Sequence, residues 1–150
     1  MSPRRGRRPV VRDFSGLEAT RPTITLVVDE MLDAEPLAPA VAHGARLIFI
    51  NEVMPGAMDP DVAAFANLHT AIVATMNNSD FRQIISRMPE DNRVRHRKAS
   101  LLAFTCEYER IRSRLAAVWD FVVSEWTLAQ ERPDKRVFLE IGSTSARTLR

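Results

Sequence analysis

The sequence lacks the features of secreted and membrane proteins. Its single cysteine, Cys106, excludes a disulfide within the chain. No apolar run approaches the roughly 18 residues of a membrane-spanning helix, so we expect no membrane partner. No hydrophobic segment near the start could serve as a secretion signal. We therefore expect a virion or intracellular location, without export by a signal peptide.

Signatures of catalysis and of metal binding are also missing. The chain has no phosphate-binding P-loop and no glycine-rich dinucleotide fingerprint. The histidines and Cys106 contain no pair at metal-ligand spacing, and nothing near Cys106 in sequence offers a base for a nucleophilic thiol. The sequence predicts a protein that is not an enzyme, with no catalytic residues, no metal and no other cofactor.

Glycine is scarce, and one long stretch contains neither glycine nor proline. The chain has 5 glycines, and none of them, nor any proline, lies between Pro89 and Pro133. Apolar residues in that stretch recur at alternating spacings of three and four, which predicts one long helix over about residues 90–130. The residues of this stripe are Leu101, Phe104, Tyr108, Ile111, Leu115, Val118 and Val122.

The segments before this helix also fit helical patterns. Residues 23–34 match an amphipathic helix better than a strand. Residues 39–54 read as a buried helix, with a short strand at 46–50 as the alternative. Asp59 followed by Pro60 marks a helix start, with an apolar face that extends to Met76. Ser79 then caps a further short helix that ends at Met88.

The predicted fold is all-α, a bundle of four to five helices with the long helix last. Residues 137–141 look like one short C-terminal strand, which would pair with 46–50 or with another copy of the protein. The chain of 150 residues is expected to form a single helical domain over 13–142. A flexible basic arm would precede it at 1–12, and a polar basic tail would follow at 143–150.

Charge is distributed unevenly along the chain. Residues 1–12 carry five arginines and no acid, whereas residues 13–63 carry nine acids against two arginines. Closely spaced guanidinium groups on an extended segment bind phosphates and release counterions, so the arm predicts a nucleic-acid partner, RNA or DNA. The arginines of the arm are Arg4, Arg5, Arg7, Arg8 and Arg12.

A second basic cluster precedes Ser100. It consists of Arg93, Arg95, Arg97 and Lys98, near the expected start of the long helix, where positive charge is unfavourable. We interpret the cluster as a second phosphate contact, and a solvated charged surface is the alternative.

The arm also resembles an AT-hook, a motif whose Arg-Gly-Arg core lies in the minor groove of A·T-rich DNA. The resemblance covers residues 3–9, and Arg8 separates the core from Pro9. The AT-hook resemblance implies DNA contact, and because of Arg8 we expect little preference among base pairs.

The predicted helix is too long for its own domain. About 40 residues span about 60 Å, whereas a compact domain of this size is about 38 Å across, from a radius of gyration of about 15 Å. Either the helix kinks or part of it contacts another surface, and we favour contact with another copy, giving a homo-oligomer. The residues expected at that contact are Leu115, Val118, Trp119, Val122 and Trp126.

Together these features predict a non-enzymatic, self-associating structural protein that coats or packages nucleic acid through phosphate contacts, as viral coat and nucleocapsid proteins do. One alternative is a dimeric DNA-binding transcriptional regulator with a helix pair over 62–88 as its reading head. The other is a helical protein-interaction adaptor that binds no nucleic acid.

Overall fold

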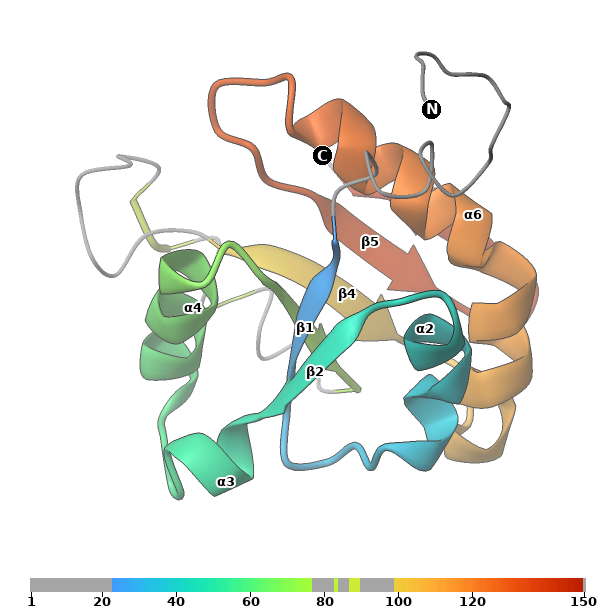
Figure 1. The fold of residues 1–150 in the computed structure, drawn as a ribbon, viewed down its shortest axis with the longest axis horizontal. Helices are drawn as coiled ribbons and strands as arrows, with labels where there is room; N and C mark the ends of the chain where they lie inside the picture. Colours follow the sequence, from blue (N-terminus) through green and yellow to red (C-terminus); the bar gives the residue numbers. More distant parts are fainter. Residues whose placement is uncertain (1–22, 77–82, 84–86, 90–98, 150) are drawn as a thin grey trace, which may run out of the picture.

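The protein is an α/β fold built on one six-stranded sheet (Figure 1), not the predicted helical bundle. The computed structural model describes residues 23–76, 83, 87–89 and 99–149. In space the strand order is β2-β1-β3-β4-β5-β6; β1 to β5 are parallel and β6 is antiparallel to β5. The strands are β1 (Thr25–Val28), β2 (Arg46–Phe49), β3 (Ile72–Thr75), β4 (Ser100–Phe104), β5 (Phe138–Ile141) and β6 (Ala146–Thr148).

Helices cover both faces of this sheet (Figure 1). The short helix α2 (Ala38–Ala42) and the long helix α6 (Ile111–Ala129) pack on one face, together with the single turn η1 (Glu35–Leu37). Helix α4 (Asp59–Leu68) packs on the other face, against β1, β3 and β4. Among the described residues, the remaining elements are the short helix α3 (Ile50–Val53) and the turn η2 (Tyr108–Arg110) that leads into α6.

Side-chain alternation along the strands divides the core into two layers. In β4, for example, Leu102 and Phe104 pack with α6, whereas Leu101 and Ala103 pack with α4. Strands buried on both faces consist mostly of apolar residues, which is typical of parallel sheets. Every residue of β1, β3 and β4 is accordingly buried.

Two of the crossover connections have opposite hands. The steps from β1 to β2 and from β4 to β5 run in opposite directions along the sheet, yet α2 and α6 lie on the same face. One of the two crossovers is therefore left-handed, although about 98% of such connections are right-handed. The step from β2 to β3 through α4 has the same hand as the α2 crossover, so the α6 crossover is the one that differs.

The predicted helices at 23–34 and 39–54 are wrong. The first contains β1, and the second contains α2, β2 and α3, so the strand alternative at 46–50 holds. The helix that begins at Asp59 is confirmed, but it ends at Leu68, and residues 72–75 form β3. The helix expected from Ser79 to Met88 falls mostly outside the described residues.

The long helix exists, but it begins at Ile111 and not near residue 90. The part of the stripe from Leu101 to Phe104 is a strand, whose apolar residues fit a helical spacing because both of its faces are buried. At 19 residues the helix is about 28 Å long, so it lies within the domain. The strand expected at 137–141 is present as β5, paired with β4 and β6 rather than with 46–50.

Candidate nucleic-acid interface

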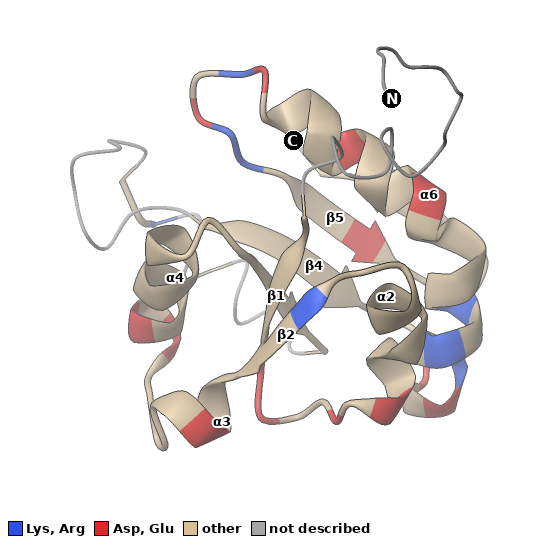
Figure 2. Ribbon diagram, in the orientation of Figure 1, with Lys and Arg blue, Asp and Glu red and all other residues tan. Residues whose placement is uncertain are grey.

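The parallel strands end together on one side of the sheet, here called the carboxyl edge, and begin together on the opposite side, the amino edge. These two edges differ in charge (Figure 2). Acidic residues follow the carboxyl ends: Asp29, Glu30, Asp33 and Glu35 come directly after β1. Basic residues stand at the amino ends: Arg46 begins β2 and is exposed, and three cations precede β5. The cations before β5 are Arg132, Lys135 and Arg136, interspersed with the acids Glu131 and Asp134.

At the carboxyl edge, polar side chains of the domain form hydrogen bonds with one another. Ligands of open parallel sheets usually bind where the strand order reverses, here between β1 and β3. In this protein the Thr75 hydroxyl donates a hydrogen bond to Asp29 across that position, at 2.8 Å, and Thr75 is buried. Near it, the Tyr108 hydroxyl donates to Asp33 at 3.0 Å. The polar groups at this switch point are thus engaged by residues of the fold itself.

Arginines at the start of α6 are likewise engaged at this edge. Arg112 forms an ion pair with Glu35. Arg110 and Arg114 donate to the backbone oxygens of Ser143 and Gly142, at 3.3 and 2.8 Å. These cations hold the carboxyl edge together and are poorly placed to receive a polyanion among the surrounding acids.

Two titratable groups at this edge have raised pKa values. The pKa of the Tyr108 phenol is raised first by its removal from water and then by its hydrogen bond to Asp33. Burial raises the pKa of the Cys106 thiol, and the nearby charges of Arg110 and Arg114 offset only part of that effect. Cys106 therefore stays a neutral thiol at neutral pH, which is the unreactive form. Among the described residues, no group of three or more His, Cys, Asp or Glu side chains could hold a metal ion.

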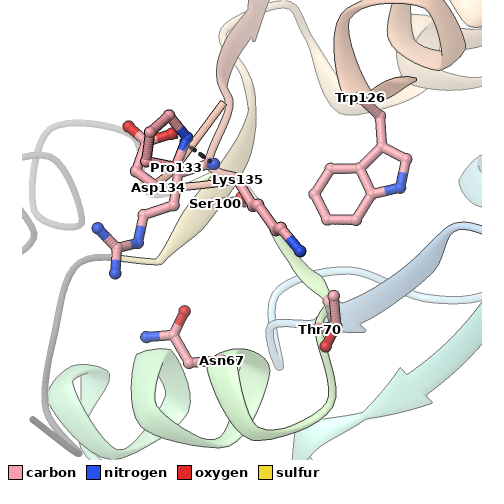
Figure 3. Close-up of a pocket in the computed structure, with 9 residues that line it drawn as sticks. Asn67, Thr70, Ser100, Trp126, Pro133, Asp134 and Lys135 are labelled. Carbon is pink, nitrogen blue, oxygen red and sulfur yellow. Dashed lines mark hydrogen bonds between the residues drawn. The ribbon is translucent and has the colours of Figure 1, made fainter. Parts of the chain in front are cut away.

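At the amino edge lies a pocket of about 320 Å³ (Figure 3). Its walls come from the end of α4, the first residue of β4, the last turns of α6 and the loop 131–137. Figure 3 shows the Lys135 side chain reaching across the pocket toward Thr70, with Trp126 and Asn67 on either side. No hydrogen bond or ion pair to the Lys135 ammonium is formed within the part of the chain that the structure describes.

Two lining residues adopt the left-handed backbone conformation, which side chains disfavour. Thr70 has φ 50° and Lys135 has φ 55°, and they are the non-glycine residues with positive φ in the described chain. At Thr70 the cause is the end of α4: Thr70 N donates to Asn67 O at 3.2 Å and Ala71 N to Ala66 O at 2.8 Å, a Schellman motif. Glycine usually occupies that position, and another residue there costs about 1–2 kcal/mol. Such strain gathers at binding sites.

The loop that carries Lys135 is anchored at several points. Arg136 N donates to the Asp134 carboxylate at 3.2 Å, and Arg132 donates to the backbone oxygen of Arg136. Val137 N donates to the Ser100 hydroxyl at 3.1 Å, which joins the loop to β4. Arg136 is only 5% exposed. The backbone that positions Lys135 is therefore held by the domain and does not depend on a ligand.

The predicted phosphate contacts lie outside this description. Arg4, Arg5, Arg7, Arg8 and Arg12, like Arg93, Arg95, Arg97 and Lys98, fall on segments beyond the described residues. The second group directly precedes Ala99 and the amino end of β4, whose Ser100 lines the pocket.

The predicted self-association residues lie on α6. Leu115, Trp119, Val122 and Trp126 are buried against the domain's own sheet, and Val118 is half-buried beside them. The helix length that led us to expect a neighbouring copy is wrong, so self-association stays a prediction without that reason.

Lys135, Thr70 and Trp126 were not predicted from the sequence to be ligand contacts. The signal available for Lys135 was its place in a Pro-Asp-Lys-Arg turn just before a strand. Nothing in the sequence marks Thr70, because a left-handed threonine has no local pattern.

Among the described residues, no helix is both long enough and apolar enough to cross a bilayer. Comparison with protein families, with curated proteins and with solved structures finds no match to this chain.

Proposed function

We propose that this protein is a non-enzymatic nucleic-acid-binding protein that contacts phosphates at the amino edge of its sheet. It would hold nucleic acid without reading bases, as coating and packaging proteins do. The observation that supports this proposal is the separation of charge between the two edges of one parallel sheet (Figure 2). A polyanion would be attracted to one edge and repelled by the other.

The positions of the basic segments in the sequence agree with this separation of charge between the two edges. The cluster 93–98 leads into the amino end of β4, and the cations at 132–136 lead into the amino end of β5. The arginines of 1–12 precede β1, the strand beside β2, which starts with Arg46. Parallel strands start at the same edge, so the described residues that begin β2, β4 and β5 lie on the side opposite to Asp29, Asp33 and Glu35.

The alternative of a transcriptional regulator is not supported, because a strand interrupts the helix pair predicted over 62–88. A helix-turn-helix over 62–88 would need helix on both sides of a short turn, but α4 is followed by the buried strand β3. The adaptor alternative predicts no binding to nucleic acid at all, so a binding measurement separates it from our proposal.

The test uses two double variants that remove equal charge from opposite edges. Arg46→Gln with Lys135→Gln changes the amino edge, and Arg110→Gln with Arg112→Gln changes the carboxyl edge. If Arg46 and Lys135 each meet a phosphate, the log–log salt slope of duplex binding should become less negative by about 1.8 for the first variant. The second variant should change the slope much less. The measurement is affinity for a duplex by fluorescence anisotropy over a range of salt concentrations.

Equal losses in the two double variants would contradict the proposal, because they would mean that binding follows net charge and not the amino edge. Thermal unfolding of both variants serves as the control for folding.

A further inference from the structure

We propose that the amino-edge pocket binds a single nucleotide unit through its terminal phosphate. This inference rests on the proposed nucleic-acid binding and specifies what one part of that edge receives. The pocket's 320 Å³ is at the low end of the about 300–1,000 Å³ of small-molecule sites. Its size suits one unit at a strand end and excludes a duplex.

The charges of the pocket favour a terminal phosphate over an internal one. The exposed ammonium of Lys135 points into the pocket (Figure 3) and has no partner among the described residues. The buried Arg136 also lines it. The one carboxylate in the lining, Asp134, accepts a bond from Arg136 N and lies 3.6 Å from Arg132 Nε, which offsets its charge. A terminal phosphate carries about −1.5 to −2 at neutral pH, so it interacts with the Lys135 ammonium more strongly than an internal phosphate, with its single negative charge, would.

Hydroxyl groups stand beside the ammonium. Thr70 presents an exposed hydroxyl on the far wall. The Ser100 oxygen accepts from Val137 N, which leaves its own O–H able to donate. Phosphate oxygens accept hydrogen bonds from such donors, and bonds to a charged acceptor are stronger than neutral ones.

The opposite wall is aromatic. Trp126 is 4% exposed, and its indole lines the pocket across from Asn67 (Figure 3). Because Trp126 is only 4% exposed, the faces of its indole are packed inside the domain, and it offers a bound base an apolar contact and not an open stacking face. One end of the pocket is therefore cationic and the other apolar, which suits the phosphate and the base of a nucleotide.

Two sources of this ligand share the same chemistry: the phosphorylated end of a strand and a free mononucleotide. The experiment uses a short single strand with a 5′ phosphate, a 3′ phosphate or neither, and a nucleoside monophosphate alone. The proteins are the full chain, Lys135→Gln and, as a matched control, Arg46→Gln. The control removes one exposed cation from the same edge, outside the pocket. Strand binding is measured by anisotropy, and mononucleotide binding by quenching of Trp126, with Trp126→Phe to identify the signal of Trp119.

We expect a phosphate at one strand end to tighten binding about tenfold in the full chain and in Arg46→Gln, and not in Lys135→Gln. If the mononucleotide quenches Trp126 in the full chain but not in Lys135→Gln, this would also support the pocket and identify the free mononucleotide as a source. Without such quenching, the strand end is the source. Strands that bind without any preference for a terminal phosphate, together with no quenching, would overturn the inference and leave the proposed function standing. If no strand binds, the proposed function fails, and the mononucleotide arm alone decides for or against the pocket.

Discussion

Leu115→Ala is expected to lower the free energy of unfolding by about 2–5 kcal/mol, the usual cost of a cavity at a fully buried leucine. Leu115 is 0% exposed and packs from α6 onto the sheet. The matched control is Leu128→Ala on the same helix, where the side chain is 54% exposed. That variant should change stability by no more than about 0.5 kcal/mol. Chemical denaturation measures both.

The same experiment distinguishes an internal helix from a seam between copies. If α6 packs only within its own chain, the denaturation midpoint of the native protein does not depend on protein concentration. A midpoint that rises with concentration, together with a Leu115→Ala loss that shrinks on dilution, would contradict the packing described here. It would mean that this face of α6 forms the predicted contact between subunits.

The second large effect concerns the arm. Deleting residues 2–12 removes five arginines, and if all five meet phosphates the duplex salt slope should become less negative by about 4.5. That slope corresponds to a roughly 500-fold change in affinity between about 50 and 200 mM salt. For single strands the expected change in slope is about 3.5.

Anisotropy titrations of the full chain and the deletion at several salt concentrations measure this effect. Competition between A·T-rich and G·C-rich duplexes tests the AT-hook resemblance, and we expect little preference. An unchanged affinity and slope in the deletion would mean that the arm does not bind, and the amino edge would then have to account for all of the binding.

Local signals predicted some elements of the fold well. Asp59 and Pro60 specify the start of a helix by themselves, and α4 begins there. The run at 137–141 is bounded by polar residues and forms β5. These predictions succeeded because the information lies in neighbouring residues.

The strands of the sheet could not be identified in the same way. In the segment 23–34, Ile24, Val27 and Val28 fit a helical spacing only because four of the five residues 24–28 are apolar. A strand buried on both faces has no period of two, and periodicity cannot separate it from a buried helix. The break between β4 and α6 contains Thr105, Cys106 and Glu107, with no glycine or proline to mark it. The predicted helix therefore extended through it.

The pocket was beyond prediction for a different reason. Thr70, Ser100, Trp126 and Lys135 come together only because β3, β4 and β5 lie side by side in the sheet. That adjacency depends on crossovers, one of which has the unusual hand. The cations Arg46, Lys135 and Arg136 were visible in the sequence, but their common edge follows only from the parallel direction of the strands.

The most direct test of an interface at the amino edge is to map it by NMR, through amide chemical-shift changes as a single-stranded oligonucleotide is added to the full chain. We predict shifts at Arg46, Ser100 and the loop 131–137, and none at 29–35 or 107–112. Shifts concentrated at 29–35 and 107–112, with the loop 131–137 unchanged, would contradict the proposed interface.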